Sequence, residues 1–217
     1  MKGEFFIFRK YFEKYISNIF TNSNDRILDI GCGESPYYHD FIRGQIVCFD
    51  IQKSKTTDII GSADFLPFRK NSFDKIIIVN SLYYFKNPFK VVEQIHDILK
   101  ENGKLVIITP FFYPIHDVPD DKYRFTEFGL RALLEDNFKV ERIDSIGGFF
   151  SLPAIVLHSL IKGFPLMAPK ILKNFTKMIA YLIFYLPYIF AQFLSFLDVL
   201  DNTKRWSTYY AAVGRKK

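Results

Sequence analysis

One short stretch, Arg26–Pro36 (RILDIGCGESP), constrains the fold of this chain more than any other. Its apolar half is typical of a buried parallel strand, which has both faces covered and therefore reads as a continuous apolar run. Its second half is a tight turn in which Gly31 and Gly33 can adopt positive φ and leave the backbone bare for a ligand. Ligands of open α/β sheets bind at the carboxyl ends of strands, so this turn predicts a nucleotide-like cofactor in the first half of the chain.

Predicted strands and helices alternate along the rest of the chain. The strands after Arg26–Pro36 are expected at 46–50, 74–80, 104–109, 138–144 and 206–213, and the helices at 5–20, 36–43, 88–100 and 126–135. This alternation predicts an α/β fold with a largely parallel sheet that is covered on both faces.

The length of 217 residues suits a single domain. Cys32 and Cys48 are far apart, and neither belongs to a C-x-x-C pair or to a cluster of metal-ligand type. This pattern predicts reduced thiols in a cytoplasmic protein, with no disulfide framework and no metal site.

The region from about residue 152 to 200 is a long apolar helical segment that Pro165, Pro169 and Pro187 are expected to interrupt. Nine Lys or Arg and only two acids lie between Leu160 and the end of the chain, so the net charge of +6 is concentrated there. Apolar helices with basic flanks are typical of proteins that lie on an anionic membrane, and a solvated helical lid is the simpler alternative.

The stretch from Ile179 to Leu197 is long enough to span a bilayer by length alone. Pro187, Gln192 and the return of the chain to a final strand argue instead for surface-lying or re-entrant helices. Three interpretations stay open for this segment: a substrate lid or homodimer face, a peripheral contact with the inner face of the membrane, and a true span.

Two acids follow the glycine turn at positions suited to a nucleoside. Asp50 ends the next predicted strand about twenty residues on, where an acid can accept hydrogen bonds from both ribose hydroxyls. Asp64 and Phe65 form an acid–aromatic pair that can accept from the amino group of adenine and pack on its ring.

In this order, the residues resemble the class I S-adenosylmethionine-dependent methyltransferases from about Arg26 to Gly148. LDIGCG, FDI and ADFLPF resemble the first three motifs of that family. The resemblance implies a Rossmann-like, doubly wound seven-stranded sheet with an antiparallel last strand, and S-adenosylmethionine as the cofactor. The hydrophobic helical insertion before that strand departs from the family, whose members commonly run almost directly from the sixth strand to the seventh. The cofactor contacts that it implies are Asp29, Gly31, Cys32, Gly33, Asp50, Ile51, Asp64, Phe65 and Asn80. The expected segments of this single domain are an N-terminal amphipathic helix (1–24), a cofactor-binding core (25–148), the insertion (149–203) and the last strand with a basic tail (204–217).

Two positions depart from the family pattern. Ser35 and Pro36 follow the glycine turn where a third glycine is common, and Tyr83–Tyr84 replaces a frequent Glu-His pair. A dinucleotide-binding enzyme is the alternative, but its G-x-G-x-x-G template needs Gly or Ala at position 36 and leaves the acid–aromatic pair unexplained.

The loop 110–126 follows a predicted strand and is rich in His, Asp, Tyr and Arg. It resembles a loop of methyltransferases that are linked with surface-polysaccharide and lipid-linked sugar modification. His116 is the candidate general base, oriented by Asp117 or Asp120, and Tyr123 and Arg124 are candidates for binding the acceptor.

Polar contacts within this loop are the alternative role for the same side chains, with Arg124 paired to Asp120 or Asp121. The expected function is O-methylation of a small-molecule or lipid-linked sugar acceptor in the cytoplasm, at the inner membrane face. A non-catalytic cofactor-binding or membrane-docking protein is the second hypothesis. Nucleic acid is not expected as a partner, because the basic residues are not interleaved with a stacking surface near the cofactor.

Overall fold

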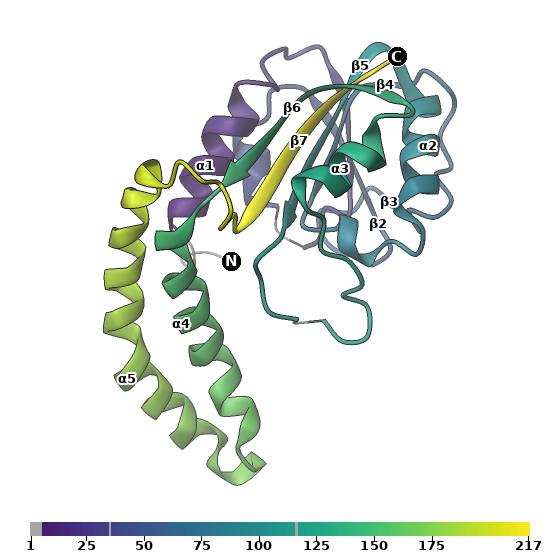
Figure 1. Cartoon of the computed structure of the whole chain (residues 1–217). Coiled ribbons are helices and arrows are strands. Elements are labelled where there is room, and N and C mark those ends of the chain that lie inside the picture. Colours follow the sequence, from purple (N-terminus) through teal and green to yellow (C-terminus); the bar gives the residue numbers. More distant parts are fainter. Residues whose placement is uncertain (1–5, 35, 116) are drawn as a thin grey trace. The chain divides into compact units, whose positions relative to one another are not determined.

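The computed structural model describes residues 6–34, 36–115 and 117–217, which form two compact units (Figure 1). The sheet unit contains the described residues within 12–111, 115–144 and 209–217. The hairpin unit contains the described residues within 6–11, 112–114 and 145–208.

A seven-stranded sheet in the order β3-β2-β1-β4-β5-β7-β6 dominates the fold, with six parallel strands and an antiparallel last strand. This confirms the expected doubly wound α/β architecture and the helical insertion before the last strand. The strands are β1 (Arg26–Ile30), β2 (Gln45–Asp50), β3 (Ile59–Ile60), β4 (Phe73–Val79), β5 (Leu99–Pro110), β6 (Phe138–Ile146) and β7 (Tyr209–Lys216). The α-helices are α1 (Phe6–Ser17), α2 (Pro88–Ile98), α3 (Glu127–Leu134), α4 (Leu152–Gly163) and α5 (Lys173–Leu194). The 3₁₀ turns are η1 (Tyr37–Phe41), η2 (Leu82–Tyr84), η3 (Phe149–Ser151), η4 (Phe164–Met167), η5 (Lys170–Leu172) and η6 (Ser195–Leu200).

The apolar strands are buried on both faces, as their sequences predict. Ile27 and Leu28 in β1 and Ile76, Ile77 and Ile78 in β4 have no exposed surface. Their burial removes large apolar areas from water and fixes the central strands of the sheet.

Capping side chains set the beginnings of two helices in the sheet unit. Asn87 accepts a hydrogen bond from the Lys90 amide at 3.2 Å, and Pro88 begins α2. Thr126, the expected N-cap of α3, accepts from the Gly129 amide at 3.1 Å. Each cap satisfies a backbone donor that the first helical turn leaves without a partner.

Three details of the secondary structure correct the sequence-based expectations. Helix α2 ends at Ile98, because Leu99 already pairs with Phe73 and begins β5. Strand β3 was not located from the sequence, since two residues carry too little periodicity to be recognised. The residues expected to form a helix after the glycine turn form the 3₁₀ turn η1.

The hairpin unit contains α4 and α5 side by side, joined through η4 and η5 (Figure 1). Pro187 lies inside α5 and does not interrupt it, contrary to the expectation, although Pro165 and Pro169 do lie in the connection. Two stretches, Phe149–Met167 and Lys170–Leu200, are long and apolar enough to cross a membrane by length and composition alone.

Candidate cofactor and acceptor site

The glycine turn after β1 presents bare backbone at the carboxyl edge of the sheet. Gly31 and Gly33 have φ of 78° and 66°, a backbone conformation that residues other than glycine rarely adopt. A Cβ on Gly31 would lie 2.3 Å from Cβ of Ser81, whereas a Cβ on Gly33 would meet no atom within 4 Å. The Ser81 hydroxyl donates to the Ile30 carbonyl at 2.7 Å and holds this close approach. The turn is therefore tightly packed beneath Gly31 and open above Gly33.

The carboxylate of Asp50 lies beside this turn. Its Oδ2 accepts from the Gly33 amide at 2.9 Å, and its Oδ1 accepts from the Gln52 amide at 2.8 Å. Each carboxylate oxygen can accept a second hydrogen bond, so both remain suited to the two hydroxyls of a ribose.

Two exposed apolar side chains, Ile51 and Phe65, directly follow Asp50 and Asp64 in the sequence. Ile51 is 70% exposed, although it directly follows β2, and Phe65 is 80% exposed. Exposed apolar surfaces next to hydrogen-bonding acids are what a flat heterocyclic base requires. The adenine contact expected for Phe65 and the cofactor contact expected for Ile51 stay predictions.

Asp64 is held rigidly at this position. Its Oδ1 accepts from the Lys86 amide at 3.3 Å, and its Oδ2 accepts from the Ser62 hydroxyl at 3.3 Å. The Gln94 side chain donates to the Asp64 carbonyl at 3.1 Å, which ties the turn to α2. The side chain is thus fixed next to Phe65.

Asn80, at the end of β4, supplies a direct test of whether a polar cofactor fits. Its backbone has φ of 55°, and its buried side-chain oxygen has no hydrogen-bond partner among the described residues. Buried polar atoms are rarely left without a partner, so a polar group of a ligand suits this position. The bare glycine turn, the Asp50 carboxylate and this amide together fit a nucleoside with a charged tail.

Asp29 and Cys32 support the glycine turn. The Asp29 carboxylate is fully buried, and its Oδ2 accepts from the Tyr38 hydroxyl at 2.7 Å and contacts Nε2 of His39 at 2.6 Å. Burial raises the pKa of Asp29, and the hydrogen bonds from His39 and Tyr38 oppose that rise. Burial also raises the pKa of the Cys32 thiol, which makes it a poor nucleophile. Both side chains contact protein, so their roles toward the cofactor stay predictions.

The glycine turn and the acids beside it lie in a segment that matches a known protein family. A family model described as a methyltransferase domain matches residues 28–107, a span that contains every predicted cofactor contact. This match and the fold support a class I S-adenosylmethionine-dependent methyltransferase. S-adenosylmethionine is the cofactor of this family, and the residues described above fit it.

Curated relatives match the methyltransferase over limited lengths. An uncharacterised protein of Methanocaldococcus jannaschii is 32% identical over 97 residues, which cover 41% of this chain and 43% of the relative. The ubiquinone/menaquinone biosynthesis C-methyltransferase UbiE of Haemophilus ducreyi is 26% identical over 131 residues, which cover 51% of this chain and 50% of the relative. The chain therefore spans half or less of the length of these relatives.

The solved structures agree in fold. A protein of Galdieria sulphuraria, proposed to be a sarcosine dimethylglycine methyltransferase, superposes with a TM-score of 0.61 at 15% identity. The superposition covers 96% of this chain and 84% of that protein. Identity at this level shows a shared fold and carries no information about the acceptor.

The loop 110–126, which we call the acceptor loop after its expected role, contacts the turn η2, which follows Asn80 and Ser81. The Tyr84 hydroxyl donates to the Asp117 carboxylate, and the Lys122 amide donates to the Tyr83 carbonyl at 3.1 Å. Burial, and then the hydrogen bond to Asp117, raise the pKa of Tyr84 to about 12, so this phenol stays protonated near neutral pH. Tyr84 was not among the predicted site residues.

Tyr123 and Arg124 take part in the contacts that hold the loop. The Tyr123 hydroxyl donates to the Lys86 carbonyl at 3.1 Å, and Arg124 forms a bidentate ion pair with Asp121 and lies over the Tyr83 ring, 5.4 Å from its centroid. The hydrogen bonds that Arg124 donates to Asp121 raise the pKa of Arg124. Of the two partners left open for Arg124, the structure shows Asp121.

The remaining residues of the acceptor loop and its surroundings are His116, Asp120 and Lys86. His116 and Ser35 lie outside the described residues, so the base proposed at His116 stays a prediction. Asp120 pairs with Lys122 at 3.0 Å. Since Lys86 also donates to Asp64, the structure links the acceptor loop to the adenine side of the cofactor site through this one residue.

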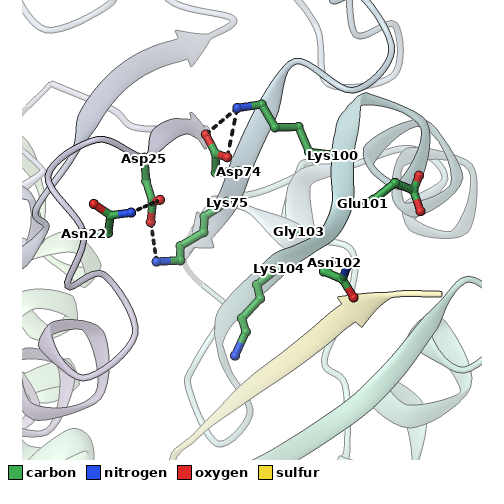
Figure 2. Close-up of a pocket in the computed structure, with 9 residues that line it drawn as sticks. All are labelled: Asn22, Asp25, Asp74, Lys75, Lys100, Glu101, Asn102, Gly103 and Lys104. Atoms are coloured by element: carbon green, nitrogen blue, oxygen red, sulfur yellow. Dashed lines mark hydrogen bonds and ion pairs between the residues drawn. The ribbon is translucent and has the colours of Figure 1, made fainter.

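A second depression, of about 260 Å³, lies at the opposite edge of the sheet, where the strands begin (Figure 2). Its charged side chains neutralise one another: Lys75 pairs with Asp25 at 2.5 Å and Lys100 with Asp74 at 2.9 Å. These pairs leave the depression without an excess of either charge, so we do not assign it to cofactor or acceptor.

Proposed function

We propose that the methyltransferase transfers the methyl group of S-adenosylmethionine to a hydroxyl of a small-molecule or lipid-linked sugar. The observation that carries the proposal is the hydrogen bond from Tyr84 to Asp117. Tyr84 follows Ser81, which contacts Gly31, by three positions in the same short turn. A carboxylate is therefore oriented near the place where the methyl donor would bind.

The residues of this chain supply orientation and a proton acceptor. The bound cofactor supplies a methyl group on a positively charged sulfur. With the cofactor bound, the Asp117 carboxylate would accept the proton of an acceptor hydroxyl that is aligned with this methyl group. Tyr84 stays protonated and holds the carboxylate in place through its hydroxyl hydrogen.

The loop residues suit an acceptor that is part polar and part apolar. Ile115 and Val118, which flank Asp117, are 72% and 80% exposed. Carboxylates recognise sugar hydroxyls, and exposed apolar side chains suit the lipid portion of a glycolipid. The resemblance of this loop to those of methyltransferases of surface-polysaccharide and lipid-linked sugars supports the same class of acceptor, and we place the enzyme in the cytoplasm at the inner membrane face.

Asp117→Asn tests the proposal. Purified enzyme is incubated with methyl-labelled S-adenosylmethionine and a panel of monosaccharides, nucleotide sugars, glycolipids and quinones, and transfer of label is measured. Loss of the proton acceptor is expected to lower the rate by about 100-fold or more. Cofactor affinity, measured by calorimetry, is expected to stay unchanged, whereas Asp50→Ala is expected to remove it.

Other outcomes would redirect the assignment. Label on a ring carbon of a quinone would favour C-methylation, the activity in the name of the Haemophilus ducreyi relative. Cofactor binding without transfer to any member of the panel would favour the non-catalytic hypothesis. An unchanged rate in Asp117→Asn would remove this residue from the mechanism.

A further inference from the structure

Helix α5 exposes a continuous apolar stripe along its whole length. The stripe residues recur at spacings of three and four, and their exposed fractions lie between 52% and 75%. Such spacing places them on one face of a helix. We call this set the outer stripe: Phe175, Met178, Leu182, Leu186, Phe190 and Phe193.

The opposite face of α5 packs on α4. Tyr188 and Ala191 form a buried cluster with Ala154 and Ile161 of α4. Within α5 only Ala180, Tyr188 and Ala191 are buried. The helix is apolar nearly all round, yet only a narrow strip of it is covered by protein, which is the pattern of a helix with a second apolar environment.

The connection between the two helices is also exposed and apolar. Leu166, Met167 and Ile171 are 70%, 84% and 91% exposed. These residues and the outer stripe together form an exposed apolar surface far larger than an isolated surface leucine.

Charge is distributed unevenly along the same hairpin. Between Leu152 and Leu197 the sequence contains no acid and no arginine, and its four charged residues are Lys162, Lys170, Lys173 and Lys177. All four are exposed and lie at or near the connection. The nearest acid, Asp198, lies at the other end, where it accepts from the Phe150 amide at 2.8 Å.

We propose that the α4–α5 hairpin docks the enzyme on an anionic phospholipid bilayer, with the outer stripe and the connection among the acyl chains near the headgroups. The four lysines then lie at the level of the lipid phosphates, where each adds to the attraction. Helix α5 lies along the surface and does not cross the membrane.

Two observations favour this occupant over the alternatives. A second copy packed in the same direction would bring the like-charged connections together, whereas lipid phosphates neutralise them in every orientation of the hairpin. A crossing by the hairpin is disfavoured because the four lysines of the connection would have to pass through the hydrocarbon core, where a charged side chain is costly. The inference stands on the hairpin unit alone and does not depend on which acceptor is methylated.

Flotation of the full chain with phosphatidylcholine vesicles, with and without phosphatidylserine, tests the proposal. The wild-type chain is expected to float with the anionic vesicles, and high salt is expected to weaken this binding. Leu182→Glu with Leu186→Glu is expected to abolish it, and removing Lys173 or Lys177 is expected to weaken it about fivefold for each lysine. Phe128→Glu is the matched control, since Phe128 is 78% exposed on α3 of the other unit.

Each contrary result has a defined meaning. A wild-type chain that stays unbound on anionic vesicles overturns the proposal, and equal flotation on both vesicle types overturns its electrostatic part. A dimer in sedimentation that the stripe variant dissociates, without vesicle binding, assigns the surface to a second copy. Calorimetry with S-adenosylmethionine shows whether each variant keeps a folded cofactor site, so failure here is separate from failure of the proposed methylation. If the stripe variant does not fold, the lysine variants decide.

Discussion

The sheet unit and the hairpin unit use the same apolar side chains in opposite ways. Ile76, Ile77 and Ile78 in β4 have no exposed surface, whereas Leu182 and Leu186 in α5 are 72% and 75% exposed. An apolar sequence thus predicts that a segment is shielded from water, but it does not predict what covers the segment. In the sheet unit, neighbouring strands and helices cover the apolar side chains. In the hairpin unit, we infer that lipid covers them.

The largest expected difference between the units is in the cost of removing an apolar side chain. Ile77→Ala leaves a cavity on one face of the sheet, where the Ile77 side chain is fully buried, and should lower the free energy of unfolding by about 2–5 kcal/mol. Leu186→Ala removes a mostly exposed side chain and should change it by less than about 0.5 kcal/mol. Urea unfolding of the two variants without lipid measures both values, and similar losses would contradict the contrast.

Gly31 and Gly33 allow a sharper comparison within the sheet unit. Gly31→Ala places a Cβ 2.3 Å from that of Ser81 in addition to a positive φ, so we expect a loss of about 3 kcal/mol. Gly33→Ala meets only the backbone cost, about 1 kcal/mol, because its added Cβ has open space. Urea unfolding of both variants checks the difference, and the same loss for each would show that Ser81 can move aside.

The local structure of the candidate cofactor site could be predicted from the sequence because local patterns determine it. The strand before Gly31 and the acid at Asp50 lie at fixed positions relative to neighbouring parallel strands. Thr126 likewise is recognisable as a cap from its immediate neighbours. Each of these features depends on residues close in sequence or on register within the sheet.

Features that depend on contacts between loops could not be predicted. Tyr84 and Asp117 are 33 positions apart and lie in irregular segments, so no periodicity joins them. Arg124 had two neighbouring acids within reach, and only the path of the loop selects Asp121. Pro187 was expected to break α5, but a helix tolerates proline when packing on one side fixes the flanking turns, and here that side is α4.

The smallest expected effect concerns Asp198, at the base of the hairpin unit. Burial raises the pKa of this carboxyl and outweighs the opposing hydrogen bonds from Ser151 and Phe150. A pKa that is higher in the folded than in the unfolded chain means that protonation favours folding. The contribution of Asp198 to the free energy of unfolding is therefore fully present below the pKa of an unfolded aspartate, about 4. It is lost as the pH rises through the pKa of Asp198 in the folded chain. Urea unfolding across this range should show that the stability of the wild type relative to Asp198→Asn falls as the pH rises. A constant difference at every pH would mean that the hydrogen bonds offset the burial, and that the charge at the base of the hairpin is as well solvated as one at the protein surface.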